Sequence, residues 1–275
     1  MHLHVQLENP PLPQRTPDGY SLSFRCWIEL ASSDDGQPVP TALVVKLPVR
    51  MGPWFIKGGG RLPATVIPGG LNPEEIKPFF DEAKNLLQLL PPPPAADGED
   101  PLHHDSVGRI HIHRLVRVEA MPYPMLFYEP YDDGDRQLRL IQPEQEHEWA
   151  IAALQLIAAF DYMHARGLVL APLGVDNVVR RSAGTPTWNY MLTGFARCDA
   201  CDPNDRTTSN EPMLTGMRQL AAVLLYEIAD PVCLNPRYKS ALSGTISAIM
   251  TPDKCLRCFQ SLRKRVTRYL LASLK

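Results

Sequence analysis

The chain has 275 residues, of which 44% are hydrophobic and 21% are charged, and its formal net charge at pH 7 is −2. A chain of this length buries a sizeable core in one bilobal domain or in two small ones, and its near-neutral charge excludes a global electrostatic attraction to nucleic acid or to an anionic membrane. The N-terminus lacks the apolar core of a signal peptide, and no stretch approaches the roughly 20 apolar residues that span a bilayer, so we expect a cytoplasmic protein. This expectation is compatible with a leader that was removed earlier and with delivery into a host cell.

Two strands and a helix are predicted in the N-terminal part of the chain. Residues 20–30 alternate apolar and polar side chains, and residues 41–48 contain a compact apolar run, so both segments are expected to be strands. A helix is expected to begin at Pro73, because an Asn precedes this proline as a cap and two acidic residues follow in the first turn. The run of prolines at residues 91–94 should end it.

The C-terminal part is predicted to be mostly helical. Residues 107–118 and 124–129 read as two further strands, and apolar residues then recur at helical spacing over residues 146–164. Residues 217–228 form a strongly apolar helical segment, and residues 256–274 form an amphipathic one. Because strands come first and helices later, the order of elements predicts an α+β architecture with two unequal lobes.

The last predicted helix is rich in basic residues. It carries Arg263, Lys264, Arg265 and Arg268, and Lys275 ends the sequence. These residues indicate a solvated helix face, and they do not favour nucleic-acid binding because aromatic residues are sparse among them.

The most informative stretch lies between residues 160 and 196. Residues 162–169 read Tyr-Met-His-Ala-Arg-Gly-Leu-Val and are followed by Leu-Ala-Pro at residues 170–172. Asn177 comes five positions after that proline, and residues 194–196 read Gly-Phe-Ala. This pattern resembles the catalytic centre of protein kinases, in which residues 170–172 would read His-Arg-Asp and residues 194–196 would read Asp-Phe-Gly.

The resemblance extends to other parts of the chain and implies a fold. Lys46, at the end of a short apolar strand, resembles the lysine that pairs with the phosphates of the nucleotide, and Glu82 on the next helix is its implied ion-pair partner. Tyr128 is at the gatekeeper position, and residues 217–227 resemble the buried helix αF. The implied fold is bilobal, with a small and mostly β N-lobe that carries one αC-like helix (residues 1–131) and a mainly α-helical C-lobe (residues 132–275).

The departures from the family pattern remove the groups that phosphoryl transfer needs. Pro172 stands where the catalytic Asp should be, within a degenerate motif that also includes Leu170 and Ala171, and Gly194 replaces the Asp that would bind magnesium. Asn177 is then the one recognisable metal-facing residue, and a single neutral amide is a poor magnesium site. The segment that should be the glycine-rich phosphate loop, residues 9–19, contains one Gly and four Pro, and prolines donate no amide hydrogen to a phosphate.

The sequence therefore resembles a pseudokinase, a kinase-like domain without catalytic activity. Lys46, Glu82 and Asn177 are interpreted as a vestigial nucleotide site, and the degraded pocket argues against ATP binding. Such a domain is expected to act by binding protein partners, for example an active kinase or a signalling protein, as a scaffold, decoy or allosteric regulator, without binding nucleic acid or membrane.

Two other interpretations remain open. The first is an unorthodox nucleotide-dependent transferase, in which Lys46, Glu82 and Asn177 hold the nucleotide and Asp176 supplies the missing carboxylate. The second is a zinc-stabilised α+β interaction domain that is unrelated to kinases, and its discriminator is whether Lys46 and Glu82 meet at all.

Four of the six cysteines form two CxxC pairs, Cys198 with Cys201 and Cys255 with Cys258. Two such pairs fit a tetrahedral structural zinc site, although their separation is longer than in a compact zinc ribbon. The kinase resemblance implies that the first pair lies in the activation segment and that Cys255 lies close to the residue that pairs with Glu211, which would bring the two pairs together. Four ordinary thiols and a disulfide are the alternatives.

Overall fold

The protein folds as a mixed α+β structure, which confirms the expected class. The computed structural model describes residues 3–4, 14–16, 19–31, 38–49, 72–90, 106–119, 124–129, 136–137, 146–182, 188–205, 210–228, 236–249, 251 and 255–273. Two compact units are distinguished: Met1–Leu87 with Arg114–Tyr131 form the first unit, and Gln88–His113 with Asp132–Lys275 form the second. The proline run at residues 91–94 and most of the predicted loop at residues 9–19 lie outside the described residues.

The first unit is built on an antiparallel sheet with the strand order β1-β3-β4-β6-β5, in which β2 also pairs with β3. Its long central hairpin pairs Tyr20 with Val49 at one end and Ala31 with Pro38 at the other. The strand predictions for residues 20–30, 41–48 and 124–129 are confirmed. The strands are β1 (Leu3–His4), β2 (Gln14–Thr16), β3 (Gly19–Ala31), β4 (Pro38–Val49), β5 (Leu115–Glu119) and β6 (Met125–Tyr128).

Helix α1 (Pro73–Gln88) completes the first unit and begins at the predicted proline. It buries Phe79, Glu82, Ala83 and Leu86, which recur at helical spacing along one side. Three of these side chains are apolar, and the fourth is a carboxylate. The burial of this acidic group within an apolar stripe is the feature of the helix that requires a chemical explanation.

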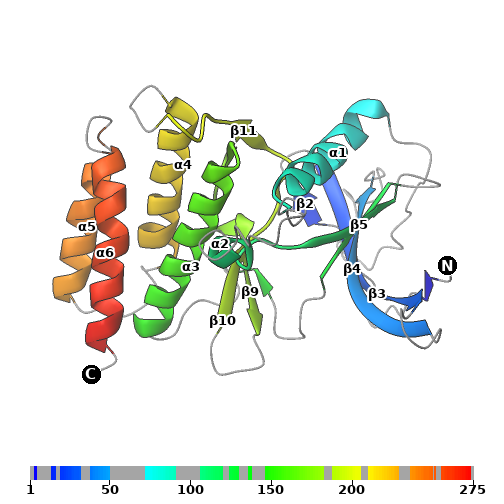
Figure 1. The fold of residues 1–275 in the computed structure, drawn as a ribbon, viewed down its shortest axis with the longest axis horizontal. Helices are drawn as coiled ribbons and strands as arrows, with labels where there is room; N and C mark the ends of the chain where they lie inside the picture. The colour runs from blue at the N-terminus through cyan, green and yellow to red at the C-terminus, as the bar shows by residue number, and fades with distance from the viewer. Residues whose placement is uncertain are drawn as a thin grey trace, which may run out of the picture. The chain divides into compact units, whose positions relative to one another are not determined.

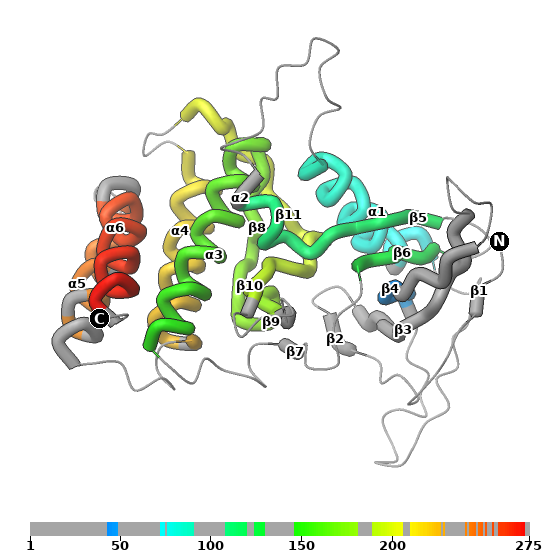
Figure 2. The backbone as a smooth tube through the Cα atoms, turned by 60° about the horizontal axis from the view of Figure 1, so that its bottom comes forward, coloured from blue at the N-terminus to red at the C-terminus, as the bar shows by residue number. Residues whose placement is uncertain are grey.

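In the second unit, four helices pack side by side, as both views show (Figure 1, Figure 2). They are α3 (Glu146–Ala165), α4 (Glu211–Ala222), α5 (Pro236–Ile249) and α6 (Cys255–Ser273). Trp149 anchors this packing, because its indole Nε1 donates to the Leu224 carbonyl at 3.0 Å and its ring meets that of Tyr269 edge-on at 6.1 Å. None of the helices in the described ranges combines the length and the hydropathy that a bilayer span requires.

The helical segment predicted over residues 217–228 begins earlier than predicted and ends at the predicted residue, and α5 was not predicted. Helix α4 begins at Glu211 rather than at residue 217, because the side chain of Asn210 caps it by accepting from the Met213 amide at 3.4 Å. Its C-terminal continuation, Val223–Ile228, is a π-helical turn. Helix α5 contains several serine, threonine and glycine residues of low helix propensity, so its existence depends on packing against α6 rather than on local sequence.

The prediction of one strand over residues 107–118 is wrong. Its first part forms the short helix α2 (Ser106–Arg109), and β5 begins only at Leu115. The β-branched residues of the segment favour a strand, but Gly108 packs directly on α3. A Cβ atom at Gly108 would lie 2.3 Å from the Ala158 carbonyl oxygen and 2.5 Å from Tyr162 Cβ, so this close approach determines the local conformation.

Short strands lie between the helices of the second unit, and two of the predicted site residues, Leu170 and Cys198, are on them. Strand β8 (Leu168–Leu170) pairs with β11 (Cys198–Ala200), and β9 (Val178–Ser182) pairs with β10 (Trp188–Leu192). Strand β7 (Arg136–Gln137) extends the second pair on the β9 side. The short 3-10 turn Val175–Asn177 lies between β8 and β9.

Candidate functional site

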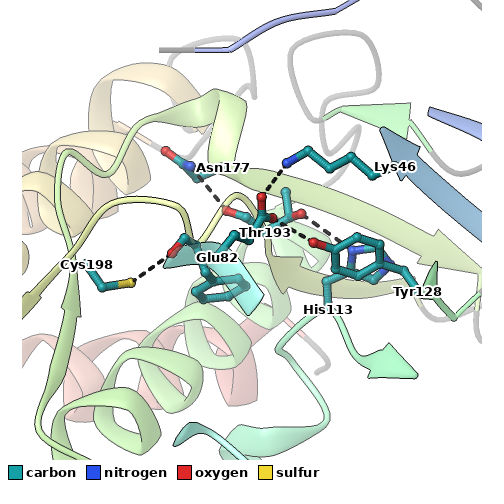
Figure 3. A network of polar contacts seen from close by, with 8 residues as sticks. Lys46, Glu82, His113, Tyr128, Asn177, Thr193 and Cys198 are labelled. Atoms are coloured by element: carbon teal, nitrogen blue, oxygen red, sulfur yellow. Dashed lines mark hydrogen bonds and ion pairs between the residues drawn. The ribbon is translucent and has the colours of Figure 1, made fainter. Parts of the chain in front are cut away.

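Lys46 and Glu82 form an ion pair, so the pairing predicted from the sequence is confirmed (Figure 3). The Lys46 ammonium donates to Glu82 Oε2 at 2.5 Å. The Glu82 side chain is 2% exposed and that of Lys46 is 18% exposed. A carboxylate buried to this degree would cost several kcal/mol if it had no partner. The ammonium of Lys46 therefore supplies a partner that the buried carboxylate of Glu82 needs.

The sheet register explains why Lys46 can reach α1. Val44 of β4 lies directly opposite Tyr128 of β6, so the two side chains point to the same face of the sheet. Lys46 is two residues along β4 and shares that face. Leu43, Val45 and Phe127 point to the opposite face, where they form an apolar cluster. The alternation of side chains thus separates an apolar face from one that carries a cation and a phenol.

Tyr128 completes the contacts of the buried carboxylate. Its hydroxyl donates to Glu82 Oε1 at 2.8 Å, and the tyrosine is itself buried. Each carboxylate oxygen of Glu82 thus accepts one bond from a different strand of the sheet. The sequence indicated the gatekeeper position of Tyr128 but not this bond, because the direction of the hydroxyl depends on the strand register.

The second unit contains Asn177, whose side chain is engaged in local structure (Figure 3). Its Oδ1 atom accepts from the Gly174 amide at 3.0 Å, and its Nδ2 atom donates to the Thr193 carbonyl at 3.1 Å. The Thr193 amide donates in return to the Asn177 carbonyl at 2.9 Å. Asn177 therefore joins its own turn to the segment that leads into Gly194. Thr193 was missed by the sequence analysis, since it takes part through its backbone.

Gly194 adopts a left-handed backbone conformation with a φ of +77°. A Cβ atom at this position would lie 2.9 Å from Asn177 Nδ2. Left-handed backbone costs little for glycine and more for other residues. The residue at the expected magnesium position thus provides no ligand, and any side chain added there would meet the amide of Asn177.

The degenerate motif at residues 170–172 has no proton-accepting side chain in the structure either. Leu170 is buried in β8, and the Ala171 amide donates to the Arg197 carbonyl at 3.2 Å. Pro172 is exposed, and so is Asp176 of the following turn. Asp176 is the carboxylate that the transferase interpretation would use. It neighbours Asn177 in the chain, but Asn177 already uses both of its side-chain polar atoms.

The four cysteines of the CxxC pairs all lie in described parts of the second unit as free thiols. Cys198 Sγ donates to the Phe195 carbonyl at 3.6 Å, and Cys255 Sγ donates to the Leu214 carbonyl at 3.9 Å. Within the residues that the structure describes, no group of three or more His, Cys, Asp or Glu side chains could hold a metal ion. The structure does not bring the two pairs together, and zinc at these thiols stays a prediction.

Glu211 pairs with a residue that the sequence analysis did not identify. Arg218, two turns further along α4, donates from a terminal nitrogen to Glu211 Oε1 at 3.3 Å. The positive charge of Arg218 also acts on Cys255, whose thiol pKa is raised by burial and partly lowered again by this arginine. The (i, i+7) spacing on one helix was the available sequence signal for the pair.

Comparison of the sequence with protein-family models and with curated proteins finds no match. The candidate residues are therefore defined by geometry alone, as two separate groups. The first unit contains the group of Lys46, Glu82 and Tyr128, and the second unit contains the group formed by the turn at Asn177 and the left-handed Gly194.

Substitution of Gly194 by alanine should destabilise the protein by about 1–2 kcal/mol, because alanine pays for the left-handed backbone and meets the Asn177 amide. The matched control is Gly174→Ala, since Gly174 has a φ of −139° and a Cβ atom there would meet nothing within 4 Å. Urea unfolding of the two variants measures the difference. Equal stability of Gly194→Ala and Gly174→Ala would contradict the geometry described for Gly194.

The reactivity of Cys201 should be low at neutral pH. Burial, followed by the nearby charge of Asp202, raises the pKa of the Cys201 thiol from 9.0 to about 11. Because the thiolate is the reactive form, the alkylation rate by iodoacetamide should rise through pH 10 and reach half its maximum near pH 11. Mass spectrometry of the labelled peptide gives this rate. Alkylation that is slow until EDTA is added would instead indicate a metal-bound thiolate at this cysteine.

Proposed function

We propose that this protein is a catalytically inactive kinase-like domain of two lobes, which acts by binding a protein partner. The proposal assigns residues 1–131 to the N-lobe and residues 132–275 to the C-lobe. The single observation that carries it is the bond network of Glu82, in which a lysine of a sheet strand and a glutamate of the following helix form a buried ion pair.

This contact favours a kinase-like domain over an unrelated zinc-stabilised one. The sequence resemblance identified Lys46 and Glu82 as partners although 36 residues separate them, and they lie in hydrogen-bond contact. A random lysine and a random helix acid would rarely meet with the acid almost fully buried, because unpaired acids are seldom found inside proteins. The order of a sheet strand, a helix and then further strands also agrees with the implied N-lobe.

The chemistry at the remaining positions favours the absence of phosphoryl transfer. Transfer of a phosphoryl group needs metal ions held by carboxylates and a residue that orients the attacking hydroxyl. Gly194 and Pro172 have no such groups, and the amide of Asn177 is bonded to backbone atoms. The same positions thus serve the local structure of the second unit. The transferase interpretation gains no support from Asp176, which is exposed.

A phosphotransfer assay with radiolabelled ATP, magnesium and a generic basic acceptor protein tests the proposal. We expect incorporation no higher than that of Lys46→Met, a variant that controls for contaminating kinases. We also expect no magnesium-dependent rise in melting temperature at millimolar ATP, since a ligand that binds the folded state must stabilise it. Labelling of the acceptor that is lost in Lys46→Met would overturn the proposal and favour the transferase.

A further inference from the structure

Helix α6 concentrates the positive charge of the protein. Its 19 residues include Arg257, Arg263, Lys264, Arg265 and Arg268 and no acidic residue. The whole chain has 28 basic and 30 acidic residues, so the remainder of the chain holds 23 basic residues against the same 30 acidic ones. The net charge of −2 is therefore the sum of a charge of +5 on α6 and a charge of −7 on the rest of the chain.

Four of these five charges, from Arg263 to Arg268, lie on the outward side of the helix. Cys255, Phe259, Leu262, Val266 and Tyr269 form its buried face, whereas the four basic residues from Arg263 to Arg268 are exposed. Lys264 and Arg268 are one helical turn apart, about 6 Å along the axis, on the side opposite the core. Leu271 follows Arg268 by three residues and is 59% exposed. The outward face thus presents a row of cations next to an exposed leucine.

Within the described part of the chain, one of the four cations of this row has an acidic neighbour in contact. Arg263 has an acidic neighbour, Asp161 of α3, at 3.5 Å. Among the residues that the structure describes, Lys264, Arg265 and Arg268 make no ion pair. Like charges one turn apart on a helix repel each other. The helix dipole stabilises cations in the last turn of a helix, but this row ends at Arg268, before the last turn of α6. An anionic partner would remove this repulsion.

The surroundings of the row indicate what kind of anion fits. The apolar face of α6 is buried inside the protein, so the helix cannot insert that face into a bilayer. Both aromatic residues of α6, Phe259 and Tyr269, are buried and offer no stacking platform for bases. Charges beyond the screening length of about 8 Å contribute little to the binding of a short acidic segment, so the basic row itself dominates the electrostatics of such a contact.

We propose that the outward face of α6, formed by Arg263, Lys264, Arg265, Arg268 and Leu271, docks a protein segment that combines carboxylates with an apolar side chain. The guanidinium groups bind the carboxylates of Asp and Glu through paired hydrogen bonds, and Leu271 contacts an apolar residue of the same segment. This surface deepens the proposed scaffold function, on which it rests, by giving the partner a defined chemistry.

The test is the binding of a short fluorescein-labelled peptide of Asp-Glu-Leu repeats to the full chain, measured by fluorescence anisotropy. We expect binding that weakens as salt is added and that falls at least about tenfold in Lys264→Glu/Arg268→Glu. Lys264→Glu alone should weaken binding. Its matched control is Lys84→Glu, an equal charge change at an exposed lysine of α1, and this control should leave binding unchanged. Leu271→Ala should weaken binding of the peptide without altering its salt dependence. Circular dichroism confirms that each variant is folded.

Three results would overturn the docking surface. The first is no binding of the peptide at low salt, and the second is an equal loss in Lys264→Glu and Lys84→Glu. The third is tighter binding of oligothymidine or of phosphatidylserine vesicles that is lost in the same α6 variants, which would assign the face to nucleic acid or membrane. None of these results depends on phosphate transfer, so failure of the docking surface and failure of the proposed function are distinguished.

Discussion

Glu82 places a carboxylate on a side chain that is 2% exposed, and the structure of the first unit depends on how this group is satisfied. Burial of the charge is tolerated only because each of its oxygens receives a hydrogen bond, one from Lys46 and one from Tyr128. Both donors come from the sheet, and the acceptor comes from α1. The three residues therefore fix the position of the helix on the sheet more specifically than apolar contacts alone, since apolar contacts have no preferred direction.

In active protein kinases a lysine–glutamate pair of this kind holds the lysine against the phosphates of the nucleotide. In this protein the carboxylate of the pair, Glu82, also accepts a hydrogen bond from a buried tyrosine, Tyr128. The amide of Asn177, in the second unit, binds backbone atoms of Gly174 and Thr193. In our account, these residues that resemble catalytic ones stabilise local structure.

The sequence predicted those parts of the site that follow from the pattern of a single element. The apolar strand that contains Lys46 and the helix that contains Glu82 can be identified from spacing, and the kinase resemblance then indicated these two residues as partners. The hydroxyl bond of Tyr128 requires the register between β4 and β6, which single-strand patterns do not contain. The error at α2 and the omission of α5 have a related cause, because Gly108 and the serine-rich α5 are defined by contacts with other helices. Whether the two CxxC pairs form one metal site also depends on tertiary structure, which the spacing of each pair does not contain.

The most direct test of this account is the unfolding free energy of Lys46→Met in the absence of nucleotide, compared with that of Lys77→Met. Both lysines have a carboxylate at 2.5 Å, but Lys77 pairs with Asp81 on the exposed surface of α1. If the buried pair is structural, Lys46→Met should lose about 2–3 kcal/mol, because Glu82 is left with one partner, and Lys77→Met should lose only about 0.3–0.5 kcal/mol. Equal and small losses in the two variants would contradict the account, since the carboxylate of Glu82 would then not need Lys46.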